Sequence, residues 1–474
     1  MDDWGLLTGS SPDSLQQLKG IAEPAQSTDP GVVDLRKMLW CSIDNDDSRD
    51  LDQLTVAEEL PNGDVKIYVA IADVDALVPK GSPLDRDAFH NTTSVYTTGK
   101  IFSMLPEKLS TDLTSLNPGV DRLAVVTEYT VGKDGEIKSS NIYRAMVHNH
   151  AKMAYNSVSP WLEGKGPLPQ PAADVKGMDD QLRIQDQAAQ KLRERRHENG
   201  ALTLETLEPK AVIQDGKVLN MYVEEKNRAR ELIEDIMVAA NGVAARFLNE
   251  KGFPTFMRVV RTPYNWGGIL QAAKEVGETL PDEPDSAALE KFLAKQKVKD
   301  PLHFPDLSVT VVKCLGRGEY AVQQPGEEPI GHFGLAVKDY SHSTAPNRRY
   351  PDIITQRLIK AALAGKPCPY TVSELDQGAE QCTEQEHIAD KVERHLRKSA
   401  AALYLSDKIG QRFDALVTGV NEKGTWVRTL KPPTEGRLVH GEEGAKVGAK
   451  LRVKLIDVDV EKGHIDFVRT GGKG

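Results

Sequence analysis

The sequence predicts an α+β protein in which a large first domain is followed by a small all-β domain. Strand-like segments gather before residue 150, helical periodicity dominates from there to about residue 409, and short strand-like segments follow. At 474 residues the chain is long enough for both domains. We divide it into an N-terminal extension (1–32), a large domain (33–408) and a small domain (410–470).

The extension and the first half of the large domain differ in polarity. Residues 1–32 hold too few apolar side chains for a core of their own, so we expect them to pack on, or flank, the large domain. The segment VKIYVAIADV follows an Asn62-Gly63 turn, and LAVVTEYTV precedes the turn KDGE. Both segments predict strands.

Helices are predicted mainly in the second half of the large domain. Residues 224–250 give the strongest helical pattern, and another predicted helix begins near Pro351 and ends before Gly365. The remaining helical segments are 150–200, an insertion over 281–305, and a long charged helix over 383–409.

The small domain has five strand candidates: FDALVTGV, TWVRTL, GRLVH, LRVKLIDVDV and HIDFVRT. Five short strands in a segment of this size suit an OB-type barrel, which is a common platform for single-stranded nucleic acids. A small all-β domain of another kind fits the pattern equally well.

Composition favours a soluble cytoplasmic protein. The formal net charge is −10, so binding to nucleic acid would need a local basic surface. The four cysteines form no CxxC pair, and the first residues lack the apolar core of a signal peptide. No apolar run is long enough to cross a membrane. We therefore expect a cytoplasmic monomer without a membrane partner.

The segment SIDNDDSRDLDQ crowds five aspartates between two predicted strands: Asp44, Asp46, Asp47, Asp50 and Asp52. Like charges held this closely repel one another unless a cation offsets them, and carboxylate oxygens suit Mg²⁺ or Mn²⁺. An EF-hand calcium loop is excluded because its sixth position would be Arg49 and its twelfth Thr55. A solvated acidic turn is the alternative.

The segment HFGLAVKDYSHSTAPNRRYPDIITQRL, residues 332–358, carries Arg348 and Arg349 between Pro346 and Pro351. A guanidinium on a stiffened backbone can grip a phosphate with two hydrogen bonds and stabilise the charge that develops in phosphoryl transfer. A surface arginine pair before a helix is the alternative.

Taken in order, these segments resemble the catalytic domain of the ribonuclease II / ribonuclease R family. The matching motifs are SIDNDDSRDLDQ (42–53), IADV (71–74), LIEDIMVAAN (232–241) and HSTAPNRRYPD (342–352). The resemblance covers about residues 33–470. It implies an RNB-type domain, a mixed sheet with surrounding helices, followed by an S1 domain with an OB fold. The implied activity is 3′-to-5′ hydrolysis of single-stranded RNA with a free 3′ end, which releases nucleoside 5′-monophosphates.

The same resemblance assigns roles to individual residues. Asp44, Asp50 and Asp52 match three of the four positions that hold the catalytic Mg²⁺, with Mn²⁺ as an alternative. Gln53 stands at the fourth metal position. Arg348 matches the arginine that contacts the scissile phosphate. The implied RNA-binding residues are Tyr96, Tyr155, Glu234, Arg349 and Glu393.

The chain departs from the family pattern at two further places. Residues 1–32 are too few for the family's cold-shock barrels, from which we expect a wider channel entrance and access for duplex RNA with a 3′ overhang. No aromatic residue lies between Ala201 and Met221, where a second base-stacking ring is expected. Two alternatives stay open: a catalytically weak RNA-binding protein that keeps the fold, and a metal-dependent nuclease acting on DNA or small nucleotides.

Overall fold

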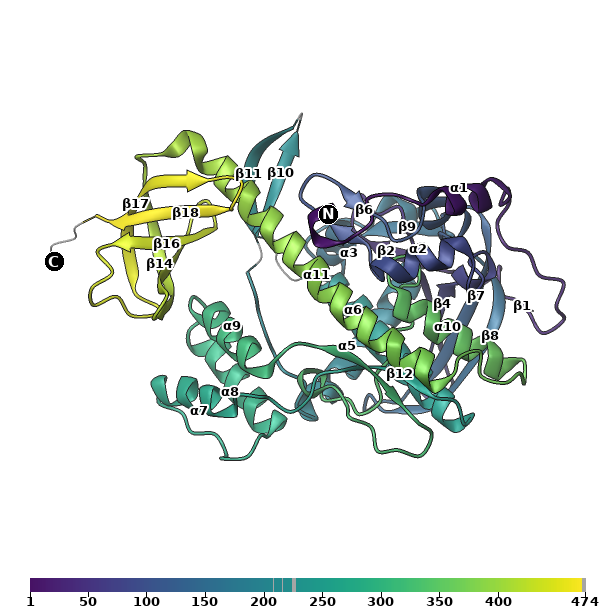
Figure 1. The fold of residues 1–474 in the computed structure, drawn as a ribbon. Coiled ribbons are helices and arrows are strands. Elements are labelled where there is room, and N and C mark those ends of the chain that lie inside the picture. Colours follow the sequence, from purple (N-terminus) through teal and green to yellow (C-terminus); the bar gives the residue numbers. More distant parts are fainter. Residues whose placement is uncertain (208, 215, 224–226, 471–474) are drawn as a thin grey trace.

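The protein consists of a large mixed body and a barrel (Figure 1). The computed structural model describes residues 1–207, 209–214, 216–223 and 227–470. The long helix α11 (Val372–Leu405) crosses the body, and its C-terminal end leads to the barrel, drawn in yellow. This arrangement confirms the predicted α+β class.

A mixed sheet forms the centre of the body, with the strand order β1-β8-β7-β4-β3-β2-β9. The β1–β8 and β2–β9 pairs are parallel, and the other neighbouring pairs are antiparallel. The strands are β1 (Val33–Asp34), β2 (Cys41–Asp44), β3 (Gln53–Glu59), β4 (Val65–Ala72), β7 (Asp121–Val131), β8 (Ile137–His148) and β9 (Ala151–Ala154).

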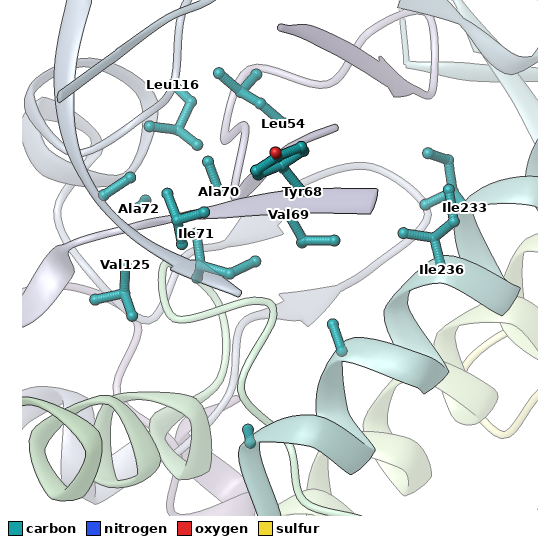
Figure 2. Close-up of a cluster of buried hydrophobic side chains, with 14 of the residues drawn as sticks. Leu54, Tyr68, Val69, Ala70, Ile71, Ala72, Leu116, Val125, Ile233 and Ile236 are labelled. Carbon is teal, nitrogen blue, oxygen red and sulfur yellow. The ribbon is translucent and has the colours of Figure 1, made fainter. Parts of the chain in front are cut away.

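Strand β4 lies in the middle of the sheet and is buried on both faces, which explains its nearly continuous apolar sequence. Because successive side chains of a strand alternate, Tyr68 and Val69 point to opposite faces of β4 (Figure 2). Ile233 and Ile236 of helix α6 belong to the same core cluster. The core therefore fixes one helix against the strands that lead into and out of the acidic segment.

Helix α6 (Arg228–Glu250) is capped at its N-terminus by Asn227, whose side chain accepts a hydrogen bond from Arg230 N. Residues 224–226, the predicted start of this helix, lie outside the described residues. The segment 150–200 begins with strand β9 instead of a helix, because β9 completes a parallel ladder with β2. The other helices of the body are α1 (Pro12–Lys19), α2 (Pro83–Asn91), α3 (Tyr155–Leu162), α4 (Gln170–Ala173), α5 (Met178–Glu198) and α10 (Tyr350–Leu363).

Helix α11 starts earlier than the sequence pattern indicated. A capping box between Thr371 and Glu374 begins the helix at Val372, eleven residues before the predicted start at residue 383. Its first turns bury Leu375, so this part belongs to the core of the body. The helix ends at Leu405, before the predicted end at residue 409.

An insertion of three helices, α7 (Trp266–Glu275), α8 (Ser286–Lys299) and α9 (Phe304–Leu315), has a core cluster of its own. The antiparallel pair β12 (Thr255–Val259) and β13 (Glu319–Gln323) brings its two ends together. The hairpin β10 (Pro209–Gln214)–β11 (Lys217–Val223) was not predicted, because most of its side chains are exposed and the apolar alternation is weak. Short elements are β5 (Val95–Tyr96), β6 (Ile101–Phe102), a π-helical turn (Lys108–Leu113) and 3₁₀ turns at Asp2–Trp4, Val74–Ala76, Phe333–Leu335 and Ser406–Lys408.

The C-terminal strands close into a barrel with the order β14-β15-β16-β18-β17. Alternate residues such as Val427, Val453 and Phe467 fill its interior. Each strand falls on one of the predicted segments, so the OB-type interpretation is confirmed. The strands are β14 (Arg412–Asn421), β15 (Gly424–Thr429), β16 (Thr434–His440), β17 (Lys450–Asp459) and β18 (His464–Arg469).

The N-terminal extension packs on the body, as expected. Leu6 is buried with Val95 and Val392, and Leu7 N donates a hydrogen bond to Asn91 Oδ1 at 2.8 Å. Among the described residues, no helix is both long and apolar enough to cross a membrane.

Candidate functional site

The acidic loop, residues 45–52, joins β2 to β3 and is anchored to the body. Ser115 Oγ accepts a hydrogen bond from Leu51 N at 2.9 Å and donates one to Arg49 O at 2.9 Å. This hydroxyl therefore holds two backbone positions of the loop at once. The loop is thus held against the body, which gives the carboxylates of Asp44, Asp50 and Asp52 defined positions.

Asp52 is the most enclosed of the three aspartates expected to bind metal, with 2% of its surface exposed. Its Oδ1 accepts a hydrogen bond from Asn347 N at 2.8 Å, and its Oδ2 lies 3.5 Å from Arg348 Nε. Burial raises the pKa of Asp52 to about 8; the Arg348 charge opposes this rise, and the Asp50 charge adds to it. More positive charge at this point would stabilise the ionised carboxylate.

Asp50 shares the same electrostatic environment. Burial raises the pKa of Asp50, with a further contribution from the charge of Asp44, while Arg348 opposes the rise. The hydroxyl of Tyr96 lies 3.5 Å from Asp50 Oδ2, at the outer limit of a hydrogen bond. The structure thus brings together the three aspartates, the arginine and the tyrosine that sequence analysis placed in one site.

Two backbone hydrogen bonds explain why Arg348 and Tyr96 are neighbours, although they lie far apart in sequence. Ser94 N donates to Arg348 O at 2.9 Å, and Tyr350 N donates to Thr92 O at 2.8 Å. These hydrogen bonds join the segment before α10 to the segment that leads into β5. Arg348 uses its backbone for this contact, so its side chain is left to face the aspartates.

Arg349 has a different position from Arg348. Asp352, which is fully buried, accepts hydrogen bonds from Arg349 Nη2 at 2.7 Å and from Ala345 N at 2.8 Å. This pair ties the turn before α10 to the first turn of the helix. The structure therefore gives Arg349 an internal partner, and its expected contact with RNA stays a prediction.

Glu393 lies on α11 and accepts a hydrogen bond from Tyr96 N at 2.8 Å. The carboxylate therefore holds the backbone of β5, and through it the ring of Tyr96. Tyr96 exposes 40% of its surface, while its hydroxyl end faces the aspartates. A ring placed in this way can meet a base next to the reacting phosphate.

Tyr155 follows strand β9, whose Ala154 pairs with Asp44 across the parallel ladder. This register puts Tyr155 beside the start of the acidic loop. The guanidinium of Arg230 lies 4.7 Å from the centre of the Tyr155 ring, and Arg230 Nη2 donates to Asn45 Oδ1 at 2.8 Å. One arginine of α6 therefore orients the tyrosine and contacts the loop.

The two other expected site residues are less closely tied to the aspartates. Glu234 is exposed on α6, one turn beyond Arg230 and on the same side of the helix. Gln53 begins β3, pairs with Ile71 and is half-buried. Within the described residues, no hydrogen bond joins its amide to Asp44, Asp50 or Asp52.

Sequence reasoning missed Arg230, Asn347 and Asp352. Arg230 had a usable signal, because it precedes Glu234 by four residues on a strongly predicted helix. Asn347 acts through its backbone N–H, which no side-chain pattern reveals. Asp352 was visible within the HSTAPNRRYPD motif, but only its burial shows that it organises the turn.

The chemistry of the aspartates fits a hard divalent cation, because carboxylate oxygens are its preferred ligands and two of the carboxyls have raised pKa values. However, among the described residues no group of three or more His, Cys, Asp or Glu side chains is arranged closely enough to hold an ion. The Mg²⁺ or Mn²⁺ site at Asp44, Asp50, Asp52 and Gln53 therefore stays a prediction.

The fold and this cluster define a two-domain protein in which an α/β body with an aspartate–arginine site precedes an OB-type barrel. Residues 32–365 match the RNB domain, and residues 411–470 match the RNase II-type exonuclease C-terminal S1 domain. The chain therefore belongs to the RNB-domain family, and the resemblance found in its motifs is confirmed.

Curated relatives and solved structures agree with this assignment. Ribonuclease R of Aquifex aeolicus is 29% identical over 92% of this chain and 64% of that protein, and Ribonuclease R of Escherichia coli is 32% identical over 95% and 59%. The chain thus spans less than two thirds of the length of these relatives. The apo structure of Mycoplasma genitalium RNase R has a TM-score of 0.88 at 24% identity and covers 99% of this chain and 77% of its own. That protein has also been solved with ribose-methylated single-stranded RNA and with double-stranded RNA.

Proposed function

We propose that this protein is a 3′-to-5′ exoribonuclease that hydrolyses single-stranded RNA stepwise to nucleoside 5′-monophosphates. The observation that carries the proposal is the meeting of Asp50, Asp52, Arg348 and Tyr96 at one point of an RNB fold. Acidic groups, a guanidinium and an aromatic ring are what a site needs to cleave a phosphodiester next to a stacked base.

Arg348 has the central role in this mechanism. Its guanidinium lies at the buried carboxylates yet exposes 42% of its side chain, so a phosphate can approach it from solvent. As water attacks the phosphorus and the 3′ oxygen leaves, negative charge grows on the non-bridging oxygens. The guanidinium would donate hydrogen bonds to these oxygens and stabilise that charge.

Asp44, Asp50, Asp52 and, with its amide oxygen, Gln53 would hold one or two Mg²⁺ ions, for which Mn²⁺ could substitute. When bound, the metal supplies an activated water and offsets the charge of the leaving oxygen. The chain itself positions these ligands, because Asn347 N orients the Asp52 carboxylate and Ser115 fixes the loop.

Recognition of RNA would rely on stacking and backbone contacts. Tyr96 lies near Asp50 and Tyr155 lies beside the start of the acidic loop. Glu234, Arg349 and Glu393 are the polar residues assigned to the same path. Such contacts read no base edges, so we expect weak sequence preference. A duplex with a 3′ overhang is a second substrate in this proposal, supported by the RNA complexes of the structural relative.

The free thiols Cys41, Cys314, Cys368 and Cys382 support a reducing compartment, and we propose that the protein works in the cytoplasm as a monomer. Size-exclusion chromatography with light scattering tests the monomer.

The activity is tested with a 3′-end-labelled oligoribonucleotide in Mg²⁺ or Mn²⁺. We expect labelled nucleoside 5′-monophosphate as the first product, from linear RNA but not from circular RNA of the same sequence. Tight binding without release in either metal would favour an RNA-binding protein without catalysis. Equal degradation of a matched DNA strand would favour a nuclease of broader substrate class.

Replacing Tyr155 with alanine should raise KM for RNA about tenfold with a smaller effect on kcat, because stacking contributes ~1–3 kcal/mol per base. Steady-state kinetics on an oligoribonucleotide provide the measurement. Tyr155→Phe keeps the ring and serves as the matched control. Equal KM values for the alanine and phenylalanine variants would show that the ring does not touch RNA.

Replacing Gln53 with aspartate should lower the Mg²⁺ concentration for half-maximal activity about three- to tenfold, because an added ligand charge tightens binding of a hard cation. Mg²⁺ titration of initial rates provides the measurement, and Gln53→Asn, which adds no charge, is the control. An unchanged Mg²⁺ requirement would place residue 53 outside the metal-binding group.

A further inference from the structure

A cavity of about 350 Å³ lies on the body, away from the acidic loop. It opens between the C-terminal half of α5, the middle of α6, the turn between β7 and β8, and the loop at residues 337–339. Cavities of this size hold small molecules of about the mass of a nucleotide. None of its lining residues is an aspartate of the acidic loop, Tyr96, Tyr155 or Arg348.

The cavity and the proposed active site involve different positions along helix α6. Arg230, which contacts the acidic loop, lies near the start of the helix, whereas Val238, Gly242 and Arg246 line the cavity. Arg246 lies about 24 Å beyond Arg230 along the axis at 1.5 Å per residue. The two sites are therefore distinct.

Besides Arg196, three cations line the cavity: Arg195, Arg246 and Lys338. Arg195 and Arg246 are half-buried, and Lys338 is exposed at the rim. Within the described part of the chain, none of the three side chains has a hydrogen bond or an ion pair. Half-buried guanidinium groups without a protein partner keep their N–H donors free to bind an anion.

The neighbouring Arg196 shows the contrast. It pairs with the buried carboxylate of Asp235, which also lines the cavity, so the negative charge of Asp235 is already compensated. The remaining acidic groups are Glu136 and Asp339. They offer hydrogen-bond acceptors at the edge of a site whose unpaired side chains are predominantly cationic.

The remainder of the lining is apolar. Leu192 and Ala239 are buried against the helices, and Val238 lies beside them. A Cβ at Gly242 would lie 3.2 Å from Arg246 Nη1 and 3.4 Å from the Asp339 carbonyl, so glycine leaves room between the cation and the loop. The site therefore combines an apolar surface with an anion-binding side.

We propose that this cavity binds a nucleoside 5′-monophosphate, with the phosphate on Arg195, Arg246 and Lys338 and the base against Leu192 and Val238. Inorganic phosphate would contact only the cations and leave the apolar surface empty. A polynucleotide would be too large for the cavity. Binding here does not depend on the proposed nuclease activity, although the ligand has the chemistry of the proposed product.

The binding test is a calorimetric titration of the full chain with 5′-AMP in EDTA, where no turnover occurs. We expect one AMP per chain, and inorganic phosphate should bind at least about tenfold more weakly. Equal affinities for AMP and phosphate would overturn the proposal, because the apolar surface would then have no ligand. Failure of this test leaves the nuclease proposal intact, since that proposal is measured by release of nucleotides in metal.

Two variants locate the site. Arg246→Gln and Lys338→Glu should each weaken AMP binding about tenfold, because each removes a charge-assisted hydrogen bond. Arg317→Gln removes the same charge from an exposed arginine outside the cavity and should bind AMP like the parent. Lys338 lies on an exposed loop, so its variant tests the site without threatening the fold. Parent-like binding by both cavity variants would overturn the proposal.

A final experiment distinguishes binding in the cavity from binding in the active site. Arg348→Ala should still bind one AMP, and photolabelling with 8-azido-AMP should modify peptides around residues 192–196 and 238–246. Loss of AMP binding in Arg348→Ala, or a label confined to the acidic loop and the tyrosines, would assign the nucleotide to the active site and overturn the proposal.

Discussion

Arg348→Ala should lower kcat for RNA hydrolysis about 10²- to 10³-fold, the usual cost of removing one preorganised donor to a developing oxyanion. The side chain of Arg348 lies near Asp52, with 3.5 Å between Arg348 Nε and Asp52 Oδ2. The hydrogen bond from Ser94 N, in contrast, is accepted by the backbone carbonyl of Arg348. Truncating the side chain therefore leaves the contact with the segment before β5 intact. Single-turnover kinetics at saturating enzyme measure the effect without interference from product release.

The adjacent arginine provides the matched comparison. Arg349→Ala leaves Asp352 as a fully buried carboxylate without its cation, and removing one partner of a buried pair costs about 3–5 kcal/mol. We therefore expect a lower Tm for Arg349→Ala and a smaller change in Tm for Arg348→Ala, because the Arg348 side chain is 42% exposed and lies farther from its carboxylate. If Arg349→Ala kept its Tm and lost affinity for RNA, Arg349 would be the RNA contact that the motif suggests. If Arg348→Ala lost its fold, the kinetic result could not be assigned to chemistry.

The sequence was sufficient for the parts of the fold that depend on local patterns. The apolar run of β4, the proline and glycine around α10, and the barrel strands all follow from periodicity and turn residues. The start of α11 was harder, because its first turns are buried on only one side and their apolar residues are diluted by Glu and Gln. The β10–β11 hairpin is mostly exposed, so its sequence carries no clear alternation of apolar and polar residues.

The candidate site likewise has a part that sequence motifs predict and a part that only the folded chain determines. Asp44, Asp50, Asp52 and Arg348 were found as residue types in ordered motifs, but their proximity depends on long-range contacts. The hydrogen bond from Asn347 N to Asp52 spans 295 positions, and that from Arg230 to Asn45 spans 185. Such pairs are set by how α6 and the segment before α10 pack on the sheet. Only the folded structure shows them.

Asp52→Asn should lower kcat about 10³-fold or more, because the site loses the charge that would hold the metal and with it several kcal/mol of transition-state stabilisation. Asparagine keeps an oxygen to accept the hydrogen bond from Asn347 N, so the loop should retain its geometry. It also removes an ionisable group that is 2% exposed, so Tm in EDTA should not fall. Rates, Tm and RNA affinity of the same preparation give the three measurements.

Asp47→Asn is the matched control for this prediction, since it makes the same change in the same loop at an exposed side chain. It should retain parent activity. RNA affinity should be retained or increased in Asp52→Asn, because a carboxylate no longer faces the phosphates. An Asp52→Asn enzyme that turns over RNA at the parent rate would exclude Asp52 from the metal-binding group. Equal losses in both variants would instead indicate that the total negative charge of the loop, and not one enclosed carboxylate, governs the chemistry.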